Sequence, residues 1–319
     1  MEAAAPEISV IVLTFNQERS IARTLDSILS QRCDVAFEVI IGEDGSSDGT
    51  RAICERYRDA YPDKVKLMPM AANKGVVRNY FDCLNAASGR YIADCAGDDY
   101  WTSNDKLGRQ YEILNANASV SVVHTGWNDC IRDYRTITPG RKMLEMLLWH
   151  ADGISVHLCT AMYRARLVKD ALRRDADMVC NELFGCEDLP VLAVLLANGD
   201  VAYMPESTLC YETERDGISH NSDLRRSAVF ACQAVYATKK LCICYDVDFA
   251  KARRYVDKSL TYAMSHAFQL HDGDLGTRVA MLSRHVGVPL TLKARIYRAL
   301  MSNDLLWRMA VTIRKMLIG

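Results

Sequence analysis

The segment Ile8-Ser9-Val10-Ile11-Val12-Leu13 is an almost unbroken run of apolar and β-branched residues that ends at Thr14-Phe15-Asn16. A run of this kind predicts a strand buried on both faces, as in a parallel sheet. A helical apolar pattern follows it, and a second apolar run, Phe37 to Ile41, stops at the Gly42-Glu43-Asp44-Gly45 cluster. The first half of the chain therefore begins as alternating strands and helices.

This alternation continues through at least three strand–helix units. Further strands are predicted at 65–68, 91–93, 120–124, 155–163 and 201–204. The pattern predicts an α/β fold with a Rossmann-like, mostly parallel central sheet flanked by helices. From Leu224 onward the pattern is almost continuously helical. We therefore expect an α/β domain over 1–221, and a helical C-terminal region over 222–319 that serves membrane attachment or oligomer contact.

Composition excludes several classes of protein. The 319 residues carry a formal net charge of −1, which argues against nucleic acid as a partner. The twelve cysteines lack the paired spacing of a zinc site and are expected to be reduced thiols. Residues 1–7 do not resemble a signal peptide, and no apolar run approaches the roughly 18 residues of a membrane span. A cytoplasmic protein, at most peripheral on the inner face of the membrane, is expected.

Three polar clusters follow three predicted strands: Thr14-Phe15-Asn16, Glu43-Asp44-Gly45-Ser46 and Asp98-Asp99. Ligands of parallel sheets bind at the carboxyl ends of the strands. The three clusters should therefore meet in one crevice, which makes this edge of the sheet the candidate binding site.

Adjacent carboxylates at a strand end suit a hard divalent cation. Mg²⁺ or Mn²⁺ takes oxygen ligands from one or two carboxylates and fills its remaining positions with phosphate oxygens and water. An Asp-Asp pair on its own is more often a solvated turn or a helix cap. The position of Asp98 and Asp99 at the crevice, followed by Tyr100-Trp101, favours the metal.

Two residues near the first strand ends suit a nucleoside. The carboxylate of Asp44 can accept hydrogen bonds from a nucleobase N–H or a ribose hydroxyl, and Phe15 can stack on a base, although plain packing of this ring is equally consistent with the pattern. Asp48 is expected to cap the helix that begins at Gly49.

Five motifs in this order and spacing resemble the inverting family-2 glycosyltransferases with the A-type nucleotide-diphospho-sugar transferase fold. They are Ser9 to Asn16, Glu43 to Thr50, Asn73-Lys74-Gly75, Gly89-Arg90-Tyr91-Ile92-Ala93 and Gly97-Asp98-Asp99-Tyr100-Trp101. The resemblance is strong over residues 6–130 and weak over 155–220.

The resemblance implies that residues 1–221 form a nucleotide-sugar-binding and catalytic domain, and it implies roles for the matching positions. The nucleotide pocket would be lined by Thr14, Phe15, Asn16 and Glu18, with Asp44 bonding the base and Lys74 and Arg78 near the base or phosphates. Asp98 would be shared between ribose and metal, and Asp99 would hold the metal. Many relatives carry an acid where this chain has Ala96, so a later ligand is expected to help. His220 is the candidate, with a solvated loop histidine as the alternative.

A general base is needed in inverting transfer, because the acceptor hydroxyl must lose its proton. The segment Cys186-Glu187-Asp188-Leu189-Pro190 resembles the late acidic motif of the family and places Asp188 at the base position. The alternative is that Glu187 and Asp188 only cap the following helix. The family tyrosine matches Tyr211, but Glu212 stands where relatives often have Arg, which puts phosphate binding by this segment in doubt.

The last helices form an apolar stripe that includes Leu292, Ile296 and Leu306. Six basic residues accompany Asp304, the single acid of the segment: Lys293, Arg295, Arg298, Arg308, Arg314 and Lys315. Such a basic amphipathic helix can lie on an anionic membrane surface, or it can pack on the catalytic domain with a solvated basic face.

The expected function is metal-dependent inverting transfer of a sugar from a nucleotide diphosphate donor, with UDP as the expected nucleotide. The acceptor is a hydroxyl of a glycan or lipid-linked oligosaccharide in surface polysaccharide synthesis. Two alternatives stay open: transfer to a lipid phosphate, which needs no strong base, and a degenerate homologue that binds nucleotide or glycan without turnover.

Overall fold

The computed structural model describes residues 5–70, 72–131, 136–152, 156–212 and 222–318. The chain divides into two compact units, called here the sheet unit and the helical unit. The sheet unit comprises Met1–Leu147, Asp152–Glu182 and Cys186–Glu212. The helical unit comprises Leu148–Ala151, Leu183–Gly185 and Thr213–Gly319.

The first four strands of the sheet unit are parallel, as the apolar runs predict. They are β1 (Ile8–Thr14), β2 (Phe37–Glu43), β3 (Val65–Leu67) and β4 (Tyr91–Ala96), in the spatial order β3-β2-β1-β4. Thr14 pairs with Glu43 and Leu13 with Ala96, so the carboxyl ends of β1, β2 and β4 lie side by side. The predicted convergence of the three polar clusters follows directly from this register.

The other half of the sheet mixes directions. β8 (Met162–Arg164) runs antiparallel to β4 and to β6 (Val120–Trp127), and β9 (Asp200–Cys210) is parallel to β6. Short strands β5 (Tyr100–Trp101) and β7 (Ile137–Thr138) pair antiparallel with β9. The described residues thus form a mixed nine-stranded sheet in the order β3-β2-β1-β4-β8-β6-β9-β5, with β7 beside β9.

The strand predicted over 155–163 is wrong for most of its length. Its middle is a 3₁₀ turn, η1 (Leu158–Thr160), and only its end joins β8. The N–H and the hydroxyl of Thr160 both donate to the carbonyl of His157, at 3.0 and 2.7 Å, so local bonds replace pairing with a strand. The strand predicted over 201–204 is longer than expected because β9 follows β6 to its end.

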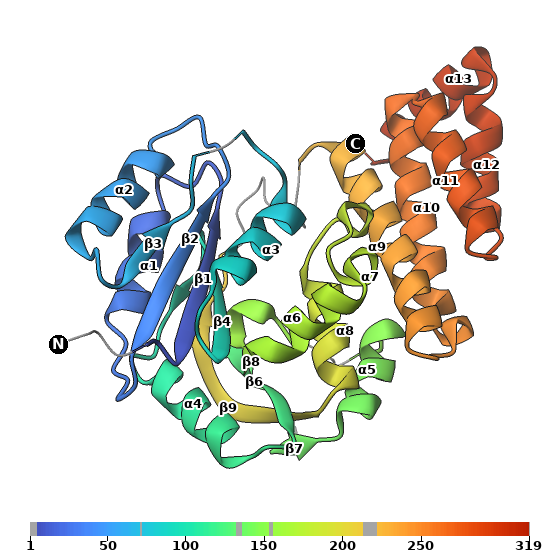
Figure 1. Cartoon of the computed structure of the whole chain (residues 1–319). Coiled ribbons are helices and arrows are strands. Elements are labelled where there is room, and N and C mark those ends of the chain that lie inside the picture. The colour runs from blue at the N-terminus through green and yellow to red at the C-terminus, as the bar shows by residue number, and fades with distance from the viewer. Residues whose placement is uncertain (1–4, 71, 132–135, 153–155, 213–221, 319) are drawn as a thin grey trace. The chain divides into compact units, whose positions relative to one another are not determined.

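Helices cover both faces of the sheet (Figure 1). One face is packed by α1 (Ile21–Leu29), α2 (Thr50–Ala60) and α4 (Lys106–Ala116), whose apolar residues share a core with alternate residues of β1 and β2. The other face is covered by α3 (Val76–Ala86), α6 (Ala165–Arg174) and α8 (Asp188–Ala197). α5 (Gly140–Leu148) and α7 (Ala176–Val179) complete the helices formed within 136–182.

The helical unit has its own core. It consists of α9 (Leu224–Cys244), η3 (Phe249–Ala252), α10 (Arg253–Leu270), α11 (Gly273–His285), α12 (Leu292–Met301) and α13 (Asp304–Ile318). Asp223, Asp272 and Thr291 cap α9, α11 and α12 by accepting backbone N–H groups of the first turn. Among the described residues, no helix is both long enough and apolar enough to cross a membrane. All twelve cysteines fall within the described ranges and are free thiols.

Candidate functional site

The end of β4 approaches the end of β1 so closely that a side chain at Gly97 would not fit. The Gly97 N–H donates to the carbonyl of Leu13 at 2.9 Å. A Cβ at Gly97 would lie 2.5 Å from Oε1 of Gln17 and 2.7 Å from Oγ1 of Thr14. The hydroxyl of Thr14 donates to Gln17 at 2.8 Å, so this predicted pocket residue supports the loop from beneath.

The loops after β1 and β2 are joined through Asn16. This residue has a left-handed backbone (φ 54°), and its N–H donates to Oγ of Ser46 at 2.9 Å. Its side-chain oxygen accepts the N–H of Ser47 at 2.8 Å. Beside it, the Phe15 ring is 45% exposed, which leaves an aromatic face open to a ligand. The bonds of Asn16 therefore define the loop conformation, while Phe15 is presented to solvent.

Glu18 and Asp48 make a second connection between the same loops. Oε2 of Glu18 accepts the N–H of Gly49 at 2.8 Å, and the N–H of Glu18 donates to Asp48 at 3.1 Å. Asp48 also accepts the N–H of Thr50 at 3.0 Å, but α2 begins at Thr50 and its N-cap is Gly49, so Asp48, the predicted capping residue, lies one residue before the N-cap. In this conformation the carboxylate of Glu18, a predicted pocket residue, accepts a hydrogen bond from the protein backbone.

Asp44 connects these loops to the start of α3. Its carboxylate is buried and accepts two backbone N–H groups, from Lys74 at 2.9 Å and from Gly75 at 3.0 Å. Each carboxylate oxygen has a second lone pair that can still accept a bond from a ligand. The ammonium of Lys74 is paired with Asp82 at 2.5 Å, and Arg78 lies 3.4 Å from Glu182 on the surface. Lys74 is therefore placed beside Asp44, whereas Arg78 is directed to an exposed ion pair.

Asp99 is a second buried carboxylate of the site. One oxygen accepts the N–H of Glu212 at 3.0 Å, while Oδ2 is buried without a hydrogen-bond partner among the described residues. Thr24 holds the main chain here by donating to the carbonyl of Asp99 at 2.6 Å. Burial, together with the negative charge of Asp98, raises the pKa of Asp99 to about 7. A buried acid with an unused oxygen fits a bound cation, which would satisfy that oxygen and favour the ionised form.

The chain contributes few further ligands to such a cation. Asp98 is half-buried next to Asp99. No group of three His, Cys, Asp or Glu side chains in the described ranges could hold a metal ion by itself. This donor set suits Mg²⁺ or Mn²⁺ completed by diphosphate oxygens and water. His220, the predicted additional ligand, lies outside the described residues.

An ion pair not anticipated from the sequence lies next to Asp99. Arg23 of α1 pairs with Glu212 at 3.1 Å, and its guanidinium lies 4.2 Å from the centre of the Tyr100 ring. Glu212 is the residue that departs from the Arg of many relatives. The guanidinium of Arg23, from α1, thus places a positive charge beside Glu212.

The predicted base, Asp188, begins α8. Its side chain is exposed to solvent. Desolvation by the surrounding protein atoms raises the pKa of Asp188, and desolvation followed by the charge of Asp188 raises the pKa of the neighbouring Glu187. A third acid, Asp94 of β4, lies within electrostatic range of both, and burial followed by their charges raises its pKa well above the usual range. Asp94 was not predicted as a site residue from the sequence. The signal that could have identified it is an acidic residue inside an otherwise apolar strand.

Cys159 connects the metal side of the site with the base. Burial raises the pKa of its thiol, and the next contributions are the charges of Asp99 and, further on, of Asp188. The thiol therefore lies within electrostatic range of both carboxylates. Cys159 is therefore near both the candidate metal acid and the candidate base.

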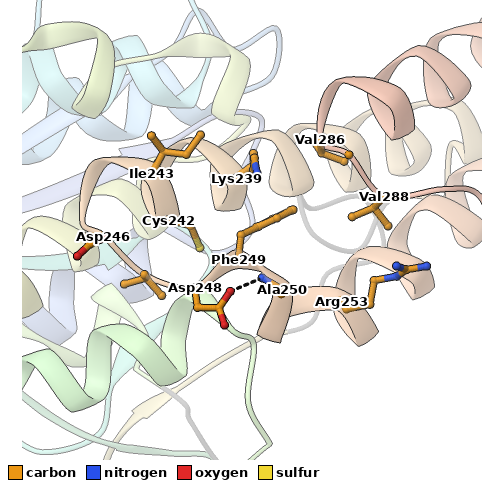
Figure 2. A pocket seen from close by; sticks show the side chains of 12 residues that line it. Lys239, Cys242, Ile243, Asp246, Asp248, Phe249, Ala250, Arg253, Val286 and Val288 are labelled. Carbon is orange, nitrogen blue, oxygen red and sulfur yellow. Dashed lines mark hydrogen bonds between the residues drawn. The ribbon is translucent and has the colours of Figure 1, made fainter.

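A separate cavity lies in the helical unit (Figure 2) and has a volume of about 760 Å³. Its walls combine apolar side chains such as Phe249 and Val288 with two cations, Lys239 and Arg253, and two acids. None of the side chains predicted from the sequence to bind donor, metal or acceptor lines this cavity. The candidate site is therefore defined by the strand ends and not by this pocket.

Comparison with known proteins places the sheet unit in a family. The model of the family described as "Glycosyl transferase family 2" matches residues 9–172, about half of the chain. The uncharacterized protein Rv1520 of Mycobacterium tuberculosis is 30% identical over 227 residues, which are 67% of this chain and 61% of that protein. The chain thus spans less than two thirds of the length of this relative.

Two further similarities agree with the family. The putative glycosyltransferase EpsE of Bacillus subtilis is 37% identical over 123 residues, covering 39% of this chain and 44% of that protein. The structure of TarS from S. aureus, solved in complex with UDP-GlcNAc, superposes with a TM-score of 0.56 and 22% identity, covering 92% of this chain and 88% of that one. This structural similarity establishes a shared fold.

Proposed function

The chain belongs to glycosyl transferase family 2, and we propose that it transfers a sugar from a nucleoside diphosphate donor to a hydroxyl of a glycan or lipid-linked oligosaccharide. Surface polysaccharide synthesis is the proposed process, and a UDP-sugar is the proposed donor. The observation that carries the proposal is Asp99, a buried acid with an unused oxygen at the strand ends where the polar clusters meet. The exposed acid Asp188 supports it, because Asp188 and Asp99 both lie within electrostatic range of Cys159. TarS, which has the same fold, was solved with UDP-GlcNAc.

The residues after the parallel strands would bind the donor. Phe15 offers its exposed face to the base, and Asp44 has lone pairs left for the base or ribose. Asp98 and Asp99 would hold Mn²⁺ or Mg²⁺, with Asp98 shared with the ribose. When bound, such a metal offsets the charge that develops on the departing diphosphate. Arg23, beside Glu212, lies where it can add a positive charge to that end of the donor.

Asp188 would take the proton of the acceptor hydroxyl as that oxygen attacks the anomeric carbon. The bond to the nucleoside diphosphate breaks on the opposite side, so one displacement inverts the configuration of that carbon. The raised pKa of Asp188 keeps it basic enough to accept a proton, and its contact with solvent lets it return the proton to water. Transfer to a lipid phosphate would not need this base, and a homologue that only binds ligands would not turn over.

The test is a thermal-shift screen of UDP, GDP, CDP and ADP, each with and without Mn²⁺. A ligand that binds only the folded state raises stability by RT ln(1 + [L]/Kd), which is about 2.7 kcal/mol at a hundredfold excess over Kd. We expect one diphosphate, UDP, to raise the melting temperature, and to do so more strongly with Mn²⁺. The matched control is Asp99→Asn, which keeps the shape but should lose the additional shift due to Mn²⁺. Absence of a shift with any nucleotide would refute the proposal.

Attachment to the cytoplasmic face of an anionic membrane is the proposed role of the last two helices. Their large apolar side chains are exposed: Leu292, Ile296, Leu305, Leu306 and Met309. Basic residues alternate with them, which suits both the acyl boundary and anionic headgroups. We expect the protein to float with phosphatidylglycerol vesicles and not with phosphatidylcholine vesicles. The double variant Leu305→Ser/Leu306→Ser should remain in the soluble fraction, and equal flotation of both proteins would contradict this role.

A further inference from the structure

Three aromatic rings from distant parts of the chain meet in the sheet unit. They belong to Trp127 at the end of β6, His157 just before η1 and Tyr211 just after β9. The ring centres of Trp127 and His157 are 4.3 Å apart, and those of His157 and Tyr211 are 5.4 Å apart. All three residues are partly exposed. The planes of neighbouring rings are inclined by 59° and 51°, and Trp127 and Tyr211 also pack against the core of the sheet unit. The rings therefore form an angled aromatic surface, part of which solvent and hence a ligand can reach.

The backbone under these rings is held firmly. The side-chain amide of Asn128 donates to the carbonyl of Tyr211 at 2.8 Å and accepts the N–H of Tyr211 at 2.7 Å. Trp127 pairs with Leu209 in the β6–β9 ladder. A preformed aromatic surface of this kind suits ligand binding, because little conformational freedom is lost on association.

Two short connections link the rings to the proposed chemistry. The residue after Tyr211 donates its N–H to Asp99 at 3.0 Å. Two residues after His157 lies Cys159, whose carbonyl accepts the indole N–H of Trp101 at 3.2 Å and whose thiol lies within electrostatic range of Asp99 and Asp188. A ligand on the rings would consequently have one end close to the carboxylates.

The strand order separates these rings from the nucleotide side. The proposed nucleotide residues follow β1 and β2, whereas the rings are attached to β6, η1 and β9. The acids Asp98 and Asp99 connect the two sides, because they follow β4 and precede β5, which pairs with β9. β6 lies two strands beyond β4 in the sheet, about 10 Å away at the usual spacing between strands. A donor that extends from β1 to β4 would thus leave the ring side to the second substrate.

We propose that Trp127, His157 and Tyr211 form the acceptor subsite, in which the apolar face of a pyranose ring lies against the aromatic surface. This inference rests on the proposed glycosyl transfer, because it assigns the second substrate of that reaction. Aromatic rings with nearby polar tips suit a sugar, which has apolar C–H faces and a rim of hydroxyls. The ring nitrogens of His157 supply polar groups for that rim.

The test uses methyl pyranosides of glucose, galactose and N-acetylglucosamine as probes. Saturation-transfer NMR is recorded with saturating UDP and Mg²⁺, which, unlike Mn²⁺, does not broaden the signals. We expect at least one methyl pyranoside to bind, with its ring-face protons saturated most strongly. Trp127→Ala should weaken this binding about tenfold and leave the Kd of UDP within about twofold, since truncating a central aromatic contact typically costs that much.

Trp127→Phe is the matched control, because it keeps an aromatic ring and should keep most of the affinity for the pyranoside. Circular dichroism at the assay temperature verifies that both variants are folded. Failure of all three pyranosides to bind would overturn the inference. It would also be overturned if Trp127→Ala lost as much affinity for UDP as for the pyranoside, because the rings would then belong to the nucleotide site. Failure of UDP to bind the unmodified protein would instead refute the proposed function.

Discussion

Replacing Asp94 by Leu should stabilise the sheet unit, and the gain should grow with pH. Asp94 is buried in β4, and neither of its carboxyl oxygens has a hydrogen-bond partner among the described residues. Burial, followed by the charges of Asp188 and Glu187, raises its pKa well above the usual 3.8. As pH rises, the folded protein therefore holds the proton of Asp94 to a higher pH than the unfolded chain does.

The magnitude follows from linkage. A folded state that binds more protons than the unfolded state becomes less stable as pH rises. A retained proton costs about 1.4 kcal/mol per pH unit over the interval between the pKa of the unfolded chain and the raised pKa of the folded protein. Asp94→Leu removes this cost. The stability difference from the unmodified protein should therefore increase with pH, by about 1.4 kcal/mol per unit within that interval.

Urea unfolding at pH 5, 6 and 7 measures this difference. The chain has four tryptophans, of which Trp149 and Trp307 belong to the helical unit. A background with both changed to Phe makes fluorescence report the sheet unit alone. Asp94→Asn is the control, because it abolishes the titration yet keeps a buried polar group, so it should give the same pH slope with a smaller gain. A gain independent of pH, or a loss of stability in the Leu variant, would refute the reasoning.

The remaining predictions concern the site itself. Asp188→Asn should lower kcat by a factor of about 10² to 10⁴ without changing nucleotide affinity. It should also abolish the rise of kcat/KM that accompanies ionisation of Asp188 at its raised pKa. Near-full activity of the variant would instead favour a lipid phosphate acceptor. Gly97→Ala should destabilise the sheet unit by about 1–3 kcal/mol in the same urea assay, because its methyl group would collide with Gln17 and Thr14, and an unchanged midpoint would contradict the close approach of β1 and β4. Mn²⁺ alone should bind weakly. UDP should raise the affinity of the protein for Mn²⁺ by the same factor by which Mn²⁺ raises its affinity for UDP, and calorimetric titration of each ligand in the presence of the other measures both factors. Equal affinity for Mn²⁺ with and without UDP would exclude a shared site.

The parallel half of the sheet was predictable because each strand is buried on both faces and therefore appears as an apolar run. The positions of Thr14, Asp44 and Asp99 followed, since the ends of parallel strands meet at one edge. The segment that became η1 was not predictable in this way. Its bonds run from Thr160 back to His157, and an apolar composition does not distinguish a buried turn from a buried strand.

Several site residues carry no sequence pattern at all. Arg23 occupies an ordinary position in an amphipathic helix, and its pairing with Glu212, 189 residues later, exists only in the folded chain. Trp127 ends a strand that the apolar pattern predicts only as far as residue 124, because Thr125-Gly126 interrupts the run. Residues that meet only through long-range contacts can be identified as neighbours only when the order of the strands in the sheet is known.

Asp94 is the acid nearest in the sequence before Ala96, the position where the family resemblance leads one to expect an acid, so it has to be considered as a substitute ligand. Residues two apart on a strand point to the same face, so Asp94 faces the same side as Ala96. It nevertheless lies about 7 Å further from the strand end, at the usual rise of a strand. An acid so deep in the sheet is directed toward Glu187 and Asp188 and cannot take the place of a ligand at the strand end. The proposed metal therefore depends on Asp98, Asp99 and the diphosphate, and for this reason its affinity should be coupled so strongly to that of the nucleotide.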